Sequence, residues 1–438
     1  MTDRSVNETK DSRQWVRSAA QKRTSLETVA PSSENKVSFF ASLDKPLLMI
    51  VATLLVIGMM MVYSTTFDWS YFERGSPTAI FLEDHAPKVL IGIVMLLLTA
   101  RIDYRFWKPF ATWLMLVTIG ALIAVIFFGD DTFGARRSLI GGRFQPSELA
   151  EFTIIVYMAA WLGAKQTRVN SFWFGFIPFA MITGVLSGLV AIQPDLSSAA
   201  IIGLSATAMY FLAGAKVLHL AISLGGAAGI AVMFTQTLSY AQDRVTSFGL
   251  ALSDPTQANY HTQQAIIAFL NGGWAGVGLG ESKQKFFLPA PHTDSIFAVI
   301  GEELGVLGAM FVVILFVALV IRGFMIARQA VDPFGSLLAA GFTFWVAIQA
   351  LVNIAVMTAL IPSTGLPLPF ISYGGSALFV LMIGVGLVLS VQRVSSTRQT
   401  LTQRRTLGAN FDRGWGNRRT RLSRTRRSRG PSTTSASG

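Results

Sequence analysis

Asp294 is the residue of this chain whose type and position are best suited to chemistry. It lies in the segment HTDSIFAVIGEELG (292–305), where a long polar stretch ends and an apolar run of membrane-spanning length begins. An ionisable group at such a boundary costs free energy, so its presence there suggests a functional role. A carboxylate can accept a proton from an attacking hydroxyl group. Asp294 is therefore the first candidate for a catalytic base.

Two other segments predict irregular backbone. PSTGLPLPFISYGGS (362–376) contains too much Pro and Gly for a plain spanning helix, and such backbone is tolerated at membrane depth only where it lines a protein-walled or watery cavity. The Gly-rich stretch GGWAGVGLG (272–280) precedes Asp294. It lacks the strand, helix and lysine of a nucleotide-binding loop. We therefore expect a re-entrant turn there, with backbone N–H contact to phosphate as the alternative.

The composition places most of the chain in a lipid bilayer. Hydrophobic residues make up 52% of the 438 residues and charged residues only 14%, a balance typical of membrane proteins. The apolar runs are long and continuous, which favours helices over the alternating strands of a membrane barrel. The chain has no cysteine, so disulfide and thiol chemistry are excluded. Its histidines lack the HExxH spacing of a zinc site.

About ten apolar runs are long enough to be read as membrane spans. They are expected near residues 47–64, 88–102, 110–128, 152–164, 172–192, 199–214, 217–234, 297–321, 337–360 and 376–394. Basic residues follow alternate spans, which by the positive-inside rule places both termini in the cytoplasm. The predicted fold is an all-α integral membrane protein with a large extracytoplasmic loop, residues 239–291, between spans 7 and 8.

The chain divides into three predicted regions. Residues 1–44 form a polar cytoplasmic segment, and residues 45–395 form the membrane domain. Residues 396–438 form an Arg-rich cytoplasmic tail, whose composition cannot bury a core. We expect both end segments to be disordered, and the tail to contact anionic membrane lipids. No motif in the chain supports a nucleic-acid partner.

Four segments carry a resemblance to a known family. They are GRFQPSE (142–148), QPDLSSA (193–199), HTDSIFAVIGEELG and PSTGLPLPFISYGGS. In this order and spacing they resemble the signatures of the SEDS family of cell-wall polymerases, the FtsW, RodA and SpoVE group, over residues 44–395. GEELG (301–305) and TGLPLPFISYGGS (364–376) look more like the division branch, FtsW, than the elongation branch, RodA.

The resemblance implies a peptidoglycan glycosyltransferase. SEDS proteins polymerise lipid II, a disaccharide peptide on undecaprenyl pyrophosphate, at the outer face of the cytoplasmic membrane. Asp294 matches the family's proposed catalytic aspartate. One base and no covalent intermediate imply inversion at the anomeric carbon, by analogy with inverting glycosidases. The resemblance also implies a class B penicillin-binding protein as partner, other divisome proteins, and a place at the division septum.

Further side chains are expected to bind or brace the substrate. Cations at the outer face would stabilise the pyrophosphate leaving group, and Mg²⁺ or Mn²⁺ could share that role. The expected residues are Arg137, Arg244, Lys283, Lys285, Glu148, Gln193, Asp195, Gln264, His292, Ser372, Tyr373 and Ser376. Simpler roles compete with these. The acids and amides fit helix caps and interhelical hydrogen bonds, and the cations fit interface anchors.

The chain departs from the family pattern at four positions. Ser138 stands where Trp is common, Glu151 where Lys is usual, Ser295 where Phe is frequent and His261 where Gln is usual. Glu148 and Glu151 lie three residues apart on a predicted helix and would repel each other. These departures weaken the expected substrate contacts but leave Asp294 in place.

Glu302 and Glu303 follow Asp294 into the predicted eighth span, where charge is costly. Protonation or pairing with cations of neighbouring spans would lower that cost. We therefore predict a structural role for both residues in preference to a catalytic one.

Two other classes of protein fit parts of the sequence pattern. A lipid II flippase or other transporter also needs many spans, a polar cavity and broken helices, but it needs no base at the outer face. A non-catalytic divisome scaffold would tolerate loss of Asp294. Within the family, an elongation polymerase of the RodA type is the alternative to a division polymerase.

Overall fold

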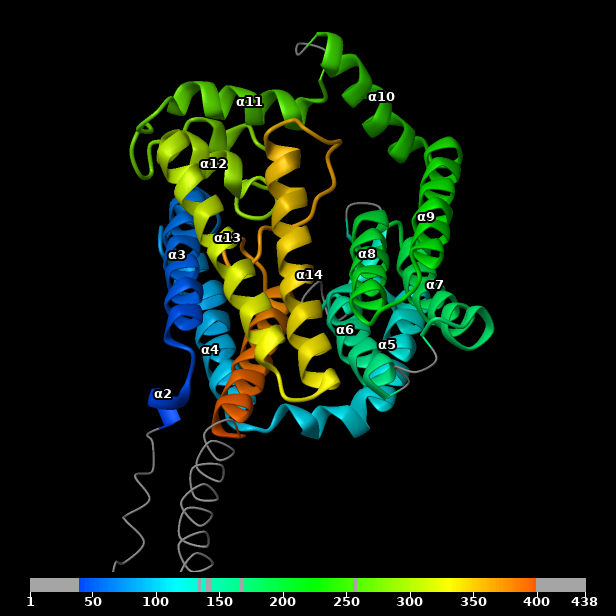
Figure 1. Ribbon diagram of the computed structural model, residues 1–438. Coiled ribbons are helices and arrows are strands. Elements are labelled where there is room, and N and C mark those ends of the chain that lie inside the picture. Colours follow the sequence, from blue (N-terminus) through cyan, green and yellow to red (C-terminus); the bar gives the residue numbers. More distant parts are fainter. Residues whose placement is uncertain (1–38, 133–134, 139–143, 165–168, 255–257, 399–438) are drawn as a thin grey trace, which may run out of the picture. The chain divides into compact units, whose positions relative to one another are not determined.

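The computed structural model describes residues 39–132, 135–138, 144–164, 169–254 and 258–398 (Figure 1). Residues 1–42 form one compact unit, in which only the short helix α2 (Phe39–Ser42) is described. Residues 43–438 form the second unit. The predicted end segments, 1–44 and 396–438, therefore lie almost entirely outside the described residues.

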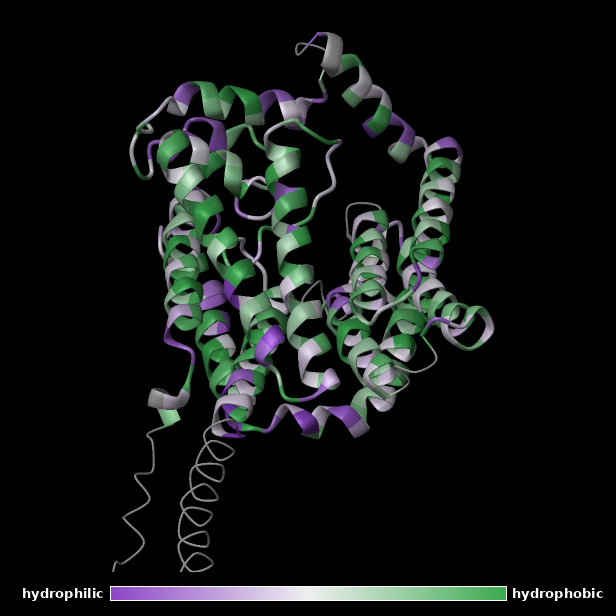
Figure 2. Cartoon of the chain, in the orientation of Figure 1, coloured by the Kyte–Doolittle hydropathy of each residue, from purple (hydrophilic) through white to green (hydrophobic). Residues whose placement is uncertain are grey.

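The second unit is built mainly from helices. In chain order they are α3 (Lys45–Arg74), η1 (Ile80–His85), α4 (Ala86–Arg101), η2 (Tyr104–Phe106), α5 (Trp107–Phe128), α6 (Pro146–Ala164), η4 (Phe172–Phe176), α7 (Ile177–Ile192), α8 (Leu196–Leu212), α9 (Val217–Thr237), α10 (Ser239–Ser253), α11 (Tyr260–Gly272), η6 (Gln284–Phe286), α12 (Ile296–Glu303), α13 (Gly305–Gln329) and α14 (Pro333–Met357). A final helix covers Ser376–Arg398. Figure 2 shows hydrophobic residues along the long helices.

Within the described part of the chain, eight helices are long and apolar enough to cross a membrane. They are Lys45–Arg74, Tyr104–Phe128, Pro146–Ala164, Phe172–Ile192, Val217–Thr237, Gly305–Gln329, Pro333–Met357 and Ser376–Arg398. The other two predicted spans correspond to α4, of 16 residues, and α8, of 17 residues. All ten predicted segments are thus helical, and the all-α class is confirmed.

The structure corrects the sequence prediction at two places. The predicted span 297–321 is divided, because Gly305 adopts a left-handed φ of 70° between α12 and α13. Such a φ is tolerated by glycine and disrupts a continuous helix. In addition, Asp130–Thr132 (β1) and Ala135–Ser138 (β2) pair as a short antiparallel hairpin. No strand was expected, and the hairpin lies in the loop that joins α5 and α6.

Burial differs sharply between the helices. In the most apolar part of α14, 67% of residues are buried within the protein, whereas the corresponding figure for α9 is 6%. Helix α14 packs against α6, α8 and α13, so it is the centre of the core. Because α9 is apolar and has few neighbours within the chain, its surface must be covered by lipid or by another protein.

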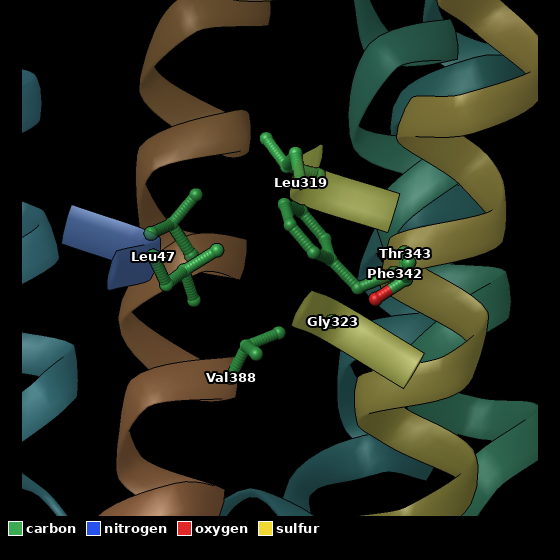
Figure 3. A pocket seen from close by; sticks show the side chains of 7 residues that line it. Leu47, Leu319, Gly323, Phe342, Thr343 and Val388 are labelled. Carbon is green, nitrogen blue, oxygen red and sulfur yellow. The ribbon is translucent and has the colours of Figure 1, made fainter. Parts of the chain in front are cut away.

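Close packing of α13 on α14 depends on Gly323. A Cβ atom there would collide with the side chain of Thr343. A small apolar cavity remains beside this contact (Figure 3). It is lined by Leu47, Leu319, Gly323, Phe342, Thr343, Val385 and Val388. Nearly all of these side chains are aliphatic or aromatic, so we assign the cavity no chemistry.

Two ion pairs join helix ends at the side of the bundle opposite α12 (Figure 1). Asp44 caps α3 by accepting a hydrogen bond from the Leu47 N–H at 2.9 Å, and it also pairs with Arg322 of α13 at 2.6 Å. Asp332 pairs with Arg105 at 3.0 Å and accepts a hydrogen bond from the Tyr104 hydroxyl. These contacts fix the connections between α3, α13, α14 and η2.

Candidate active site

Asp294 lies in the turn that leads into α12, and its side chain is partly buried. The Thr293 hydroxyl donates a hydrogen bond to Asp294 Oδ1 at 3.1 Å. Burial raises the pKa of Asp294, while His261, hydrogen bonds to the carboxylate and Arg244 act in the opposite direction. A raised pKa makes the carboxylate a stronger base than an exposed aspartate.

The Pro- and Gly-rich segment 362–376 holds this turn in place. The Ser372 hydroxyl donates to the carbonyl oxygen of Thr293 at 2.6 Å, and the Tyr373 N–H donates to that of His292 at 2.7 Å. Gly365, with a φ of 77°, lies so close that a Cβ atom there would be 3.8 Å from Asp294 Oδ2. The irregular backbone expected from the sequence therefore forms one wall around the carboxylate.

Asn353 of α14 locks the two segments together, and sequence reasoning missed it. Its Nδ2 group donates to the carbonyl oxygen of Asp294 at 2.8 Å and to that of Leu366 at 2.7 Å. Asn353 is buried. The available signal was a polar pair one helical turn apart, Gln349 and Asn353, in an otherwise apolar helix.

An aromatic group with one lysine adjoins the Asp294 turn. The ring of His292 stacks on Trp69 with centroids 5.0 Å apart and meets the edge of Tyr373 at 5.5 Å. Tyr373 also stacks on His85 at 5.4 Å, and Lys88 Nζ lies 4.9 Å from the Tyr373 ring centroid. His292 and Tyr373 were expected at the site. Trp69, His85 and Lys88 were not, because they come from α3, η1 and α4, far from Asp294 in the sequence.

The segments 142–148 and 193–199 form a polar network on neighbouring helices. Asp195 caps α8 through the Ser198 N–H at 3.1 Å, and its other oxygen accepts from the Ser147 hydroxyl at 3.2 Å. Gln193 donates to the carbonyl oxygen of Leu122 at 3.0 Å. Asp195 thus makes a helix-cap contact and Gln193 an interhelical contact, which are the structural roles considered as alternatives to substrate binding.

Two contacts connect this network to the segment 362–376. The Ser376 hydroxyl interacts electrostatically with the Glu148 carboxyl group. The Ser197 hydroxyl donates to the carbonyl oxygen of Thr364 at 2.7 Å. All four segments singled out from the sequence therefore meet in one region, with 362–376 between the other three.

The Gly-rich stretch 272–280 is a turn folded onto α12. Its Val277 and Gly278 N–H groups donate to the carbonyl oxygens of Glu302 and Glu303 at 3.0 and 3.1 Å. A Cβ atom at Gly276 would collide with the Glu303 carbonyl group. A turn is present as expected, and its re-entry into the membrane stays a prediction. These two N–H groups are used by the protein itself, which argues against a phosphate cradle at this point.

A model of the family described as "Cell cycle protein", for FtsW, RodA and SpoVE, matches residues 45–397. The chain belongs to this family. A Geobacter sulfurreducens protein named "Probable peptidoglycan glycosyltransferase FtsW" is 38% identical over 356 residues, 80% of this chain and 94% of the relative. Bacillus subtilis "Stage V sporulation protein E" is 36% identical over 361 residues, 80% of this chain and 97% of the relative.

The fold is shared with solved structures of the family. One chain from "Structural coordination of polymerization and crosslinking by a peptidoglycan synthase complex" superposes with a TM-score of 0.64 and is 25% identical. The match covers 81% of this chain and 98% of that chain. The family predicted from the four segments is therefore confirmed, and relatives named FtsW agree with the division branch.

Three departures from the FtsW/RodA/SpoVE pattern have partners in the structure. His261 Nε2 lies 2.7 Å from the Ser295 hydroxyl, so two of the departing residues contact each other beside Asp294. Glu151 Oε2 accepts a hydrogen bond from Trp345 Nε1 at 2.8 Å. That hydrogen bond offsets part of the desolvation of the buried Glu151 carboxyl group.

The basic residues that were expected to bind substrate differ in their surroundings. Lys285 pairs with Asp68 at 2.8 Å, donates to the Gly280 carbonyl at 3.0 Å, and has a side chain only 7% exposed. These contacts stabilise the loop, and the expected contact of Lys285 with substrate stays a prediction. Arg244 of α10 acts electrostatically on Asp294. Lys283 is exposed and Gln264 is partly buried on α11.

The side chain of Arg137, on β2, lies outside the described residues, so its expected role is untested. Across the ranges that the structure describes, no three His, Cys, Asp or Glu side chains are grouped as a metal site requires. These residues do not fit a protein-held Mg²⁺ or Mn²⁺, and we assign no reaction step to a metal.

Proposed function

We propose that this protein is a peptidoglycan glycosyltransferase that polymerises lipid II into glycan strands during cell division. The observation that carries the proposal is the position of Asp294. This partly buried carboxylate lies where all four family segments meet, next to an aromatic group and under the electrostatic influence of Arg244. The names of the most similar relatives support the same activity.

Asp294 is the general base of the proposed reaction. It accepts the proton of the 4-hydroxyl group of the acceptor sugar while that oxygen forms a bond to the anomeric carbon of the donor. The bond from this carbon to the pyrophosphate oxygen breaks, and its electron pair leaves with undecaprenyl pyrophosphate. Direct displacement inverts the anomeric carbon. Asn353 and Ser372 keep the Asp294 turn rigid during this step.

The leaving group gains negative charge as its bond breaks, so cations placed beforehand stabilise the transition state. Arg244 acts electrostatically on Asp294, and Lys88 lies over the ring of Tyr373 in the adjoining aromatic group; the proposal assigns this charge to both. Trp69 and Tyr373 supply aromatic surface, which replaces the Trp expected at Ser138. Glu148 and Ser376 brace the wall formed by 362–376.

The proposed location is the cytoplasmic membrane at the division septum, with Asp294 at the outer face and both termini inside. The positive-inside distribution of basic residues supports this orientation. A class B penicillin-binding protein is the proposed partner, together with other divisome proteins and membrane lipids. The structural relative from a peptidoglycan synthase complex supports such a partner.

Glycan synthesis from labelled lipid II tests the proposal. Purified protein with its penicillin-binding partner is compared with Asp294→Asn and with Asp243→Asn, an exposed carboxylate of α10. We expect the first variant to lose about 10²- to 10⁴-fold in rate, and the second to match the wild type. Equal rates for wild type and Asp294→Asn would remove the base. No polymer from a folded wild-type complex would favour a flippase or a scaffold.

A further inference from the structure

His261 and Ser295 form a hydrogen-bonded pair directly beside Asp294. Ser295 is fully buried, and its hydroxyl donates to the carbonyl oxygen of Pro289 at 2.6 Å. A hydroxyl group carries one hydrogen. At the contact with His261 Nε2, 2.7 Å away, Ser295 must therefore accept. This assigns the proton of the neutral imidazole to Nε2 and leaves the lone pair on Nδ1.

The pair ties α11 to the turn that carries Asp294. Ser295 follows Asp294 in the chain, and its hydroxyl joins both ends of the turn 289–295 to the imidazole of α11. Loss of the imidazole would leave a buried hydroxyl oxygen without its donor, and the turn would loosen. His261 therefore contacts the Asp294 turn through Ser295.

His261 and Asp294 also interact electrostatically. Burial lowers the pKa of His261 below its ordinary value, the Asp294 carboxylate acts in the opposite direction, and Arg244 adds to the lowering. Charged groups on the elements packed against α11 lie elsewhere: Glu302 binds Asn271, Glu303 binds Ser64, Lys285 pairs with Asp68, and Arg322 and Arg328 occupy the far half of α13. Helix α14 has no charged residue. Asp294 and Arg244 are therefore the charged groups that act on His261.

We propose that His261 is a positioning residue that holds the Asp294 turn through Ser295 and takes up a proton at Nδ1 in place of Asp294. A proton that arrives from solvent can bind to His261 instead of to the Asp294 carboxylate. Asp294 therefore stays ionised at lower pH. This inference rests on the proposed function, in which Asp294 must be ionised to act as a base. In this proposal the fall in polymerisation rate at acid pH is set jointly by the titration of Asp294 and His261, as expected for coupled groups.

The first test is the pH profile of lipid II polymerisation by the complex, for wild type, His261→Gln and His261→Ala. The Gln amide still donates to Ser295 but takes up no proton. We expect it to keep the plateau rate and to move the acid limb up by about one pH unit. His261→Ala should lower the plateau as well. His219→Gln is the control, because this buried histidine contacts Tyr210 and not the site; its profile should keep the wild-type midpoint.

A second test does not need activity. In ¹⁵N-histidine spectra of the full-length protein, assigned with His261→Gln, the titration midpoint of His261 should fall in Asp294→Asn, because the variant removes the carboxylate. An unchanged midpoint, or superimposable pH profiles for wild type and His261→Gln, would overturn the inference. Absence of polymer from the wild type would instead count against the proposed function, and the titration would still decide the role of His261.

Discussion

Glu302 is predicted to hold the Gly-rich turn in place, and its substitution gives a measurable local effect. Its carboxylate accepts hydrogen bonds from the Ser282 hydroxyl, from the Gln284 N–H at 3.0 Å and from Asn271 Nδ2 at 3.1 Å. Ser282 and Gln284 are buried, whereas Asn271 is exposed and can bind water instead. Glu302→Ala therefore leaves two buried donors without a partner.

Each buried donor without a partner costs about 1–3 kcal/mol, so two cost about 2–6 kcal/mol of local stability. Amide hydrogen exchange measures this quantity directly. Exchange in peptides covering 273–288 should become roughly 30-fold to 10⁴-fold faster in Glu302→Ala. Glu302→Gln keeps a carbonyl acceptor for both buried donors, so we expect a much smaller increase.

Equal exchange rates for wild type and Glu302→Ala in these peptides would refute the reasoning, because they would show that Glu302 does not stabilise the turn. Polymerisation by Glu302→Gln gives a separate check. Activity close to that of the wild type supports the structural role, and loss of activity with normal exchange would point to a role in catalysis.

Three further predictions concern other contacts. Gly365→Ala should lower polymerisation, because a left-handed alanine costs about 1–2 kcal/mol and this strain would fall on backbone in van der Waals contact with Asp294. Gly214→Ala, which is also left-handed but has open surroundings, should not, and equal losses would refute this. Asn353→Ala should lower both thermal stability, by about 1–3 kcal/mol, and activity, since it frees the Asp294 and Leu366 carbonyls; unaltered melting would contradict it. Burial alone would raise the pKa of Asp332, but Tyr104 and Arg105 hold it below its ordinary value. The stabilisation that Asp332 provides is therefore present above the ordinary pKa of aspartate and is lost as the pH falls through the pKa of the folded state. Asp332→Asn should reduce the acid sensitivity of unfolding.

The membrane fold can be predicted from this sequence because the signal is local. A continuous apolar run can satisfy its backbone hydrogen bonds in lipid only as a helix, or as part of a closed barrel. All ten predicted segments are helical in the structure. Asp294 can be recognised for a related reason, since a carboxylate next to an apolar run is conspicuous without any knowledge of its neighbours. The same holds for the irregular segment 362–376.

The surroundings of Asp294 were decided by the tertiary structure. Lys88 meets Tyr373 across 285 positions of sequence, and Ser64 meets Glu303 across 239. No local pattern carries such pairings, because they depend on how helices pack. The ion pair between Lys285 and Asp68 of α3 is another such pairing, and the predicted contact of Lys285 with substrate stays a prediction. Likewise His261 and Ser295 appear in the sequence as unrelated departures, and only the packing of α11 on α12 makes them one hydrogen-bonded pair.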